Sequence, residues 1–303
     1  MGIEFGMSLT GIEGIAGSAR RLEKLGYDFI GCGEHVSFHG PTSNSFISLS
    51  VAAGATERIK LLSAVVLLPL YPAALAAKLA ATLDVASGGR YHMGVGVGGE
   101  MPREFEACGV PLSERGARTN EALQVIRRLW VEDKVSFTGR FNTLHDVSIL
   151  PKPLQRPNPP IWVSGRKDAA MKRAARYGDG WMPYMYTPEM LTDSIVKIRA
   201  WAQDAGRAQD AVKPALFAFT CCHSDRKRAL EMAVARLSQQ YAQDFSKIAE
   251  RYVIVGSPAD CRARVQQYVD AGARTIFLSS ACEAGYVTLN EEILANEVIP
   301  AFH

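Results

Sequence analysis

The hydrophobic positions of the chain fall into short continuous runs that are separated by longer amphipathic stretches. Such runs, bounded by turn residues, are typical of parallel strands that are buried on both faces of a sheet. We therefore expect eight strands, at residues 3–7, 29–32, 61–66, 93–97, 161–164, 181–183, 215–220 and 275–278.

The stretches between these runs have the spacing of helices with one apolar face. Ile15, Ala19 and Leu22, for example, share one side of a predicted helix. Several helices are followed by a glycine and then directly by a strand, as at Gly26 and Gly272, because glycine readily adopts the left-handed conformation that ends a helix. The predicted helices cover residues 11–25, 72–85, 114–131, 168–177, 188–205, 225–250 and 258–271.

Eight strands that alternate with helices predict an α/β fold, and over 303 residues they favour a closed (β/α)8 TIM barrel over an open doubly wound sheet. One connection is longer than the others. Residues 131–160 contain a predicted hairpin around Thr138-Gly139-Arg140, followed by a proline-rich segment that runs extended into the fifth strand. We expect a single barrel domain over residues 1–303, with an insertion at 131–160.

The composition narrows the classes of partner. Lys and Arg total 34 against 31 Asp and Glu, and the resulting net charge of +3 is too small for a nucleic-acid-binding protein. The most apolar stretch, residues 61–77, is interrupted by Pro69 and Pro72, which favours a buried strand and helix over a membrane span. No secretory signal is visible at the start of the chain, so we expect a cytoplasmic protein without nucleic-acid or membrane partners.

Candidate chemistry is expected at the carboxyl ends of the strands, which form the reactive end of such barrels. His35 and Glu34 follow the second strand, and a histidine there can act as an acid or base near neutral pH or simply donate a structural hydrogen bond. The six cysteines are scattered without a C-x-x-C pair, so we expect neither a metal site nor a disulfide framework.

The fourth strand carries the glycine-rich segment Gly94-Val-Gly-Val-Gly-Gly-Glu100. Its spacing formally matches a dinucleotide-binding fingerprint, but Met101-Pro102 follows and no helix begins within it. Two explanations remain open: the strand is crowded at the centre of the barrel, or its backbone approaches a flat ligand closely.

Ser164, Gly165 and Arg166 lie where the fifth strand turns into a helix. Free backbone N–H groups at the start of that helix, with Arg166 beside them, form a potential phosphate site. An ordinary helix cap with solvated charges is the alternative.

Longer segments around these residues resemble, in order along nearly the whole chain, the motifs of the bacterial luciferase-like monooxygenase superfamily. Within it, the chain looks most similar to the branch that uses the deazaflavin coenzyme F420. The segments include Leu25-Gly-Tyr-Asp-Phe-Ile-Gly-Cys-Gly-Glu-His35, Leu61-Leu-Ser-Ala-Val-Val-Leu-Leu-Pro-Leu70 and Pro159-Pro-Ile-Trp-Val-Ser-Gly-Arg166.

The resemblance implies that the C-terminal mouth of the barrel binds F420 or, alternatively, FMN. It also implies a bulge in the third strand with a non-proline cis peptide behind the ring, which maps to Ala64–Val65. His35 falls on a position proposed as the acid/base residue of deazaflavin relatives, and we add its neighbour Glu34 as a second catalytic candidate. The predicted cofactor-binding residues are Ser63, Ala64, Val65, Gly98, Gly99, Ser164, Gly165 and Arg166, and the candidates for the substrate pocket are Phe38, His39, Glu100 and Tyr184.

The resemblance therefore implies an F420-dependent oxidoreductase that transfers a hydride between carbon 5 of the deazaflavin and a small organic substrate. It also implies a homodimer. Two alternatives stay open: a monooxygenase that receives reduced FMN from a separate flavin reductase, and a non-catalytic cofactor-binding protein. No local residue pattern separates F420 from FMN, because the two share their ring shape and phosphate.

Overall fold

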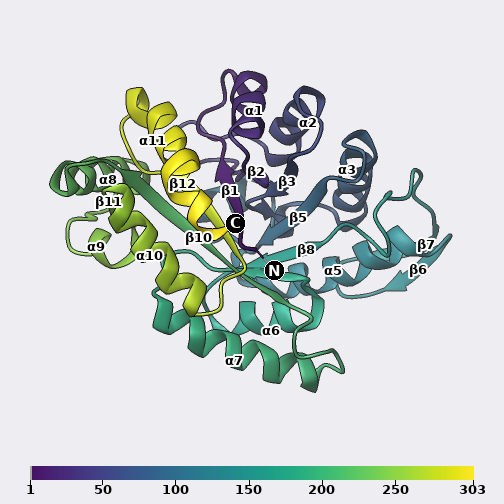
Figure 1. The fold of residues 1–303 in the computed structure, drawn as a ribbon. Helices are drawn as coiled ribbons and strands as arrows, with labels where there is room; N and C mark the ends of the chain where they lie inside the picture. The colour runs from purple at the N-terminus through teal and green to yellow at the C-terminus, as the bar shows by residue number, and fades with distance from the viewer. Residues whose placement is uncertain (1) are drawn as a thin grey trace.

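Parallel strands close on themselves to form a barrel in the computed structural model, which describes residues 2–303 (Figure 1). The last barrel strand pairs with the first, and β9 pairs with β10 to complete the circle. The eight predicted strands and the (β/α)8 barrel are confirmed within these residues. The barrel strands, in spatial order, are β1 (Glu4–Ser8), β2 (Phe29–Cys32), β3 (Lys60–Ser63), β5 (Tyr91–Gly96), β8 (Ile161–Ser164), β9 (Gly180–Met182), β10 (Lys213–Cys222) and β12 (Thr275–Ser280).

Helices surround the barrel, and most of them lie where the apolar spacing predicts them (Figure 1). The first begins later than expected, because residues 11–14 form bends and not a helical turn. The predicted helices are α1 (Ile15–Lys24), α3 (Ala73–Ala86), α5 (Arg115–Val131), α6 (Asp168–Tyr177), α7 (Pro188–Asp204), α8 (Arg226–Tyr241) and α10 (Pro258–Asp270).

The helix α2 (Ser45–Ala55) was not predicted. Its eleven residues contain no charged side chain, so no polar face marks the helical period. The Asn44 side chain caps its first turn by accepting a hydrogen bond from the Ile47 backbone N–H at 3.2 Å. Three short helices were also missed: α4 (Pro102–Ala107), α9 (Ala249–Tyr252) and α11 (Val287–Ile293).

The prediction of one helix over residues 225–250 is wrong beyond residue 241. Ala242 adopts a left-handed conformation with a φ of 49°, which ends α8. The chain then turns back, and Phe245 packs into a small second core over the C-terminal part of β10. The short strand β11 (Ile254–Gly256), also not predicted, pairs with that part of β10 outside the barrel.

The expected hairpin in the 131–160 insertion is confirmed. Its strands β6 (Val135–Thr138) and β7 (Thr143–Val147) pair antiparallel. The Glu121 carboxylate on α5 accepts hydrogen bonds from the backbone N–H groups of Arg140, Phe141 and Asn142 at 2.7–2.9 Å, which fixes the tip of the hairpin on that helix.

The barrel interior is filled by side chains and leaves no channel through its centre. The Phe277 ring lies so close to β1 and β2 that an added Cβ at Gly6 would come within 2.3 Å of it, and one at Gly31 within 2.2 Å. At the N-terminal end, Glu4 forms ion pairs with Lys60 and Lys213. Burial raises the pKa of Glu4, but the two lysines outweigh burial and the pKa is lowered overall. A ligand site of the barrel is therefore expected at its C-terminal end.

The apolar stretch 61–77 forms the end of β3, the short strand β4 (Val66–Leu67) and the start of α3, as expected. No helix within residues 2–303 is long and apolar enough to cross a membrane.

We expect Gly31→Ala to lower the free energy of unfolding by about 1–3 kcal/mol, because the new methyl group overlaps the Phe277 ring. Urea denaturation measures the change. Gly17→Ala is the matched control: no atom lies within 4 Å of its added Cβ in α1, so this variant should gain about 0.5–1 kcal/mol. Adding Phe277→Leu to Gly31→Ala should recover part of the loss, and equal stabilities of Gly31→Ala and the natural protein would contradict the tight interior.

Candidate active site

The third strand ends in a bulge that forms part of the floor of the C-terminal mouth. After Ser63, the peptide bond between Ala64 and Val65 is cis, and the chain resumes as β4 beside β5. The predicted position of the bulge and its cis peptide is confirmed. Ala64 and Val65 are partly exposed, and both pack against the buried cluster of the barrel core that contains Leu62 and Phe277.

Three glycines make room for this bulge. A Cβ added at Gly33 would lie 2.8 Å from the Ala64 carbonyl oxygen, and one at Gly94 only 1.8 Å from the Ser63 carbonyl oxygen. An added Cβ at Gly96 would lie 2.6 Å from the Val65 side chain. Crowding between neighbouring strands therefore accounts for Gly94 and Gly96.

Gly98 and Gly99 have a different reason to be glycine. Both have positive φ angles, of 61° and 114°, which other residues adopt only with strain. Both are partly exposed at the end of β5. Gly98 and Gly99 remain candidates for close contact with a ligand, because a glycine has no side chain to keep a ligand away from its backbone.

His35 is held at the mouth by a buried acid. Its Nδ1 lies 3.2 Å from Oε2 of Glu104, whose side chain is fully buried in α4. The same carboxylate oxygen accepts a hydrogen bond from the Val36 backbone N–H at 3.1 Å. The His35 ring also stacks on Phe38, with 4.2 Å between ring centroids. These contacts fix the orientation of the imidazole. Among residues 2–303, no hydrogen-bond partner lies at the other ring nitrogen, Nε2.

Glu34 occupies a different position from the one expected of a catalytic acid. Its buried carboxylate accepts hydrogen bonds from the backbone N–H groups of Ser45 and Leu67 and from the side chains of Asn44 and Tyr71, at 2.9–3.1 Å. Burial raises the pKa of Glu34, although these hydrogen bonds oppose the rise. Glu34 therefore ties the end of β2 to α2 and β4, and its oxygens are already engaged.

Ser63 also differs from the expectation for a cofactor-binding side chain. It is fully buried, and its hydroxyl lies 2.5 Å from the hydroxyl of Tyr91. The side chain is therefore not accessible to a ligand in this structure, and the accessible part of the bulge consists of Ala64 and Val65.

Arg166, Tyr184 and Glu100 come together at the rim. The Arg166 guanidinium lies 4.7 Å from the centroid of the Tyr184 ring, and the Tyr184 hydroxyl donates a hydrogen bond to Glu100 at 2.5 Å. Burial and the neighbouring Glu100 carboxylate raise the pKa of Tyr184 to about 12. Ser164 and Gly165 are partly exposed just before α6, so the expected phosphate site is sterically open.

Several residues near this site were not found from the sequence. Glu104 contacts His35 across 69 positions of the chain, and no local pattern marks that contact. Tyr241 packs edge-on against Phe38, with 5.9 Å between the ring centroids, and continues into Phe219 and Phe245. Tyr241 is the last residue of α8, whereas the sequence predicts a helix that continues to residue 250.

His92 lies inside the barrel, where its Nδ1 accepts a hydrogen bond from the Trp162 indole N–H at 3.1 Å. Burial lowers the pKa of His92 to about 3, so its ring is neutral and cannot serve as a proton donor near neutral pH. Within residues 2–303, no group of three or more His, Cys, Asp and Glu side chains is arranged to hold a metal ion.

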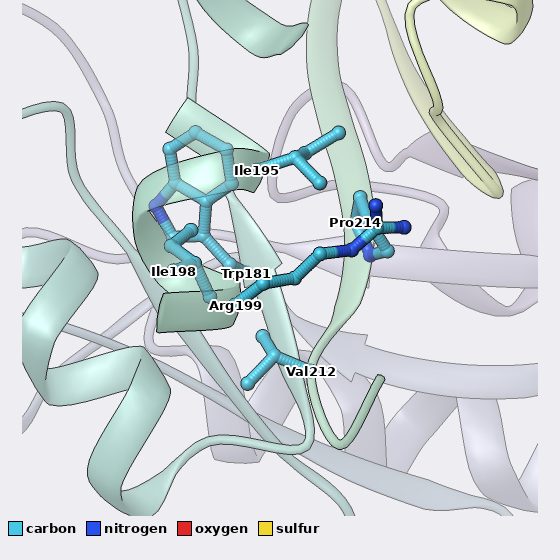
Figure 2. Close-up of a pocket in the computed structure, with 6 residues that line it drawn as sticks. All are labelled: Trp181, Ile195, Ile198, Arg199, Val212 and Pro214. Carbon is cyan, nitrogen blue, oxygen red and sulfur yellow. The ribbon is translucent and has the colours of Figure 1, made fainter. Parts of the chain in front are cut away.

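A small cavity lies between α7 and the strands β9 and β10, away from the mouth (Figure 2). Its volume of about 10 Å³ accommodates at most about one water molecule, so it is not a substrate site. Its lining residues are Trp181, Ile195, Ile198, Arg199, Val212 and Pro214.

A family model described as luciferase-like monooxygenase matches residues 5–275. The chain belongs to the luciferase-like monooxygenase family. The resemblance inferred from the motifs is thereby confirmed, and the chain is a member of an enzyme family.

Its relatives use two kinds of cofactor. An F420-dependent glucose-6-phosphate dehydrogenase of Kineococcus radiotolerans is 27% identical over 292 residues, which cover 85% of this chain and 84% of the relative. An FMNH2-dependent dimethylsulfone monooxygenase of Pseudomonas putida is 36% identical over 178 residues, or 58% of this chain. The chain spans about half the length of some curated relatives, 48% of that monooxygenase and 57% of an uncharacterised protein of Mycobacterium tuberculosis.

Solved structures of two oxidoreductases are also similar to this chain. A monooxygenase of Streptomyces bottropensis has a TM-score of 0.84 and 26% identity, with 99% of this chain and 100% of that chain covered. An F420-dependent secondary alcohol dehydrogenase has a TM-score of 0.85 over the full length of both chains. Because its identity is 22%, that likeness shows the fold alone.

Proposed function

We propose that this protein is an F420-dependent oxidoreductase that transfers a hydride between the coenzyme and a small organic substrate. The observation that carries the proposal is the His35–Glu104 pair, 3.2 Å apart, whose histidine lies on the loop that begins at Gly33 against the Ala64 carbonyl group of the bulge. An oriented imidazole suits a reaction in which a proton leaves or joins an oxygen atom while a hydride moves. The F420-dependent relative that covers 85% of this chain supports the same choice.

The residues at the mouth fit a deazaflavin. Gly98, Gly99 and the small Ala64 side chain are partly exposed at the mouth, and together they offer a surface for a flat ring. Arg166 is exposed at the start of α6, where a phosphate would also meet backbone N–H groups. A bound deazaflavin would supply the hydride acceptor or donor at its carbon 5.

His35 then handles the proton. Its Nδ1 faces the Glu104 carboxylate, so that nitrogen carries the hydrogen and Nε2 presents the lone pair. When an alcohol is oxidised, Nε2 accepts the hydroxyl proton as the hydride leaves the adjacent carbon. When a ketone is reduced, the same nitrogen returns a proton to the oxygen. Glu104 stabilises the imidazolium that forms between these steps, and Glu34 positions the loop without touching the substrate.

A reduced-FMN monooxygenase is the second candidate. The FMNH2-dependent relative, at 36% identity over 178 residues, favours it. In that case the bulge and Arg166 would hold the FMN ring and phosphate, and a separate flavin reductase would be a partner. A cofactor-binding protein without turnover would leave the oriented His35 without a task.

We expect purified protein to bind F420 more tightly than FMN, as measured by quenching of the cofactor fluorescence. With reduced F420, it should consume no oxygen. Arg166→Ala should weaken F420 binding about tenfold, because a charge-assisted hydrogen bond to the phosphate is lost. Arg176→Ala, at the other end of α6, is the control and should bind normally. Tight FMN binding with no affinity for F420 would overturn the proposal.

We expect His35→Ala to leave F420 binding largely intact and to slow turnover by about 10²–10⁴-fold, the usual size of an acid/base contribution. Glu104→Gln replaces the carboxylate with an amide that can turn its N–H2 group toward Nδ1 and favour the wrong tautomer of His35. Its kcat for alcohol oxidation should therefore fall by about 10²–10⁴-fold while F420 binding stays the same. Glu106→Gln, on the exposed side of the same helix, should keep the natural kcat. An unchanged rate for His35→Ala would remove His35 from the mechanism.

We also propose that a second copy of the chain covers the outer face of α2 and α3. Ile47 is 67% exposed, Val51 44% and Leu75 49%, and α2 has no charged residue to solvate that face. Sedimentation analysis should find a homodimer, and Ile47→Glu should shift it toward the monomer because a charge would be buried. Val196→Glu, on the equally exposed Val196 of α7, is the control. A monomeric natural protein would contradict this proposal.

A further inference from the structure

A continuous series of aromatic rings runs from the barrel core to His35. Phe277 at the centre stacks on Phe217, with 5.8 Å between ring centroids, and Phe217 contacts Phe219 edge-on at 5.5 Å. Phe219 meets Tyr241 at 6.0 Å, and Tyr241 meets Phe38 at 5.9 Å. Phe38 stacks on the imidazole at 4.2 Å. We call Phe217, Phe219, Tyr241 and Phe38 the aromatic arc.

The arc joins parts of the chain that are far apart in sequence. Phe217 and Phe219 belong to β10, Tyr241 ends α8, and Phe38 lies on the loop after β2. Phe38, Phe217 and Tyr241 are partly exposed, whereas Phe219 is buried behind them. The side of the mouth between β10 and His35 is therefore lined by aromatic rings, the last of which stacks on the imidazole of His35.

The polar groups beside the arc do not favour an anion. Glu100 lies near Tyr241, and together with burial it raises the pKa of that phenol. Glu100 also accepts the hydrogen bond from Tyr184, whose ring lies under Arg166. Arg166 is the cation that the proposed cofactor phosphate needs. Of the other cations, Arg115 lies against Gly99 on the cofactor side and donates a hydrogen bond to the Leu112 carbonyl oxygen, while Arg236, near Tyr241, is exposed to solvent on α8.

We infer that the mouth takes an uncharged, apolar alcohol or ketone, with its oxygen at His35 and its hydrocarbon part against the aromatic arc. This inference rests on the proposed F420-dependent activity. A phosphorylated sugar would bring its charge toward the Glu100 carboxylate and its hydroxyl groups toward rings that offer few hydrogen-bond partners. Apolar contact, by contrast, gains free energy with each carbon that is removed from water.

The test follows the reduction of F420 by the full-length protein with cyclohexanol, 1-phenylethanol, a series of linear secondary alcohols, glucose and glucose 6-phosphate. We expect kcat/KM to rise by about fourfold for each added methylene until the arc is covered, as the transfer free energy of a methylene predicts. The apolar alcohols should exceed both sugars by at least about a hundredfold.

Variants of the aromatic arc test whether its side chains determine the preference for apolar alcohols. Tyr241→Ala and Phe38→Ala should each raise KM for 1-phenylethanol about tenfold while F420 binding stays the same. Thermal melting checks that both variants fold, and Tyr252→Ala, on α9 outside the arc, is the matched control with unchanged kinetics. Glu100→Gln should narrow the gap between the apolar alcohols and glucose 6-phosphate.

The outcomes separate the two proposals. Failure to bind F420 would overturn the proposed function itself. If F420 binds but glucose 6-phosphate is the better substrate, or if none of the apolar alcohols reacts, the inference about the substrate is wrong. Normal selectivity in both Tyr241→Ala and Phe38→Ala would also overturn it, because the arc would then make no contact with the substrate.

Discussion

The contact between the bulge after β3 and the glycines of its neighbouring strands is the constraint on which the mouth depends. The carbonyl oxygens of Ser63 and Ala64 point into space that a side chain would occupy at Gly94 or Gly33. Because two strands give up their side chains there, the bulge can sit on the packed barrel core and expose Ala64 and Val65. The position of β4, and through it the attachment of Glu34 to Leu67, follows from the same contact.

Two buried acids, Glu34 and Glu104, make different contacts near the end of β2. Glu34 accepts hydrogen bonds from backbone and side-chain donors of α2, β4 and the residues beside them, so its role is structural, and these four hydrogen bonds offset part of the cost of its burial. Oε2 of Glu104 accepts the hydrogen bond from the Val36 backbone N–H and also lies 3.2 Å from Nδ1 of His35. The imidazole is thus oriented by a carboxylate that is itself fixed, as acid/base catalysis requires.

The sequence allowed the barrel to be predicted because its strands are continuous apolar runs, a signal that needs no tertiary information. Apolar periodicity does not predict elements whose extent depends on tertiary packing. The helix α2 carries no charged side chain, so its residues show no clear helical period. The helix α8 ends at Ala242 because the chain folds back onto the second core, with Phe245 buried there. Gly98, Gly99 and Arg166 lie at the mouth as their motifs indicate, whereas the burial of Ser63 against Tyr91 depends on a residue 28 positions away. Glu104 and Tyr241 share this limit, since their partners are distant in sequence.

The strand β10 is longer than the barrel requires, and its C-terminal end belongs to a separate part of the fold. The strand runs ten residues, and its last three pair with β11 outside the barrel, where α8 and the segment after it build their own core. This extension supplies Tyr241, while the barrel strands pair among themselves without it. Residues 226–253 thus place Tyr241 on a core separate from the barrel interior, so a change in this segment can reshape the aromatic arc while the pairing among the barrel strands is made by other residues.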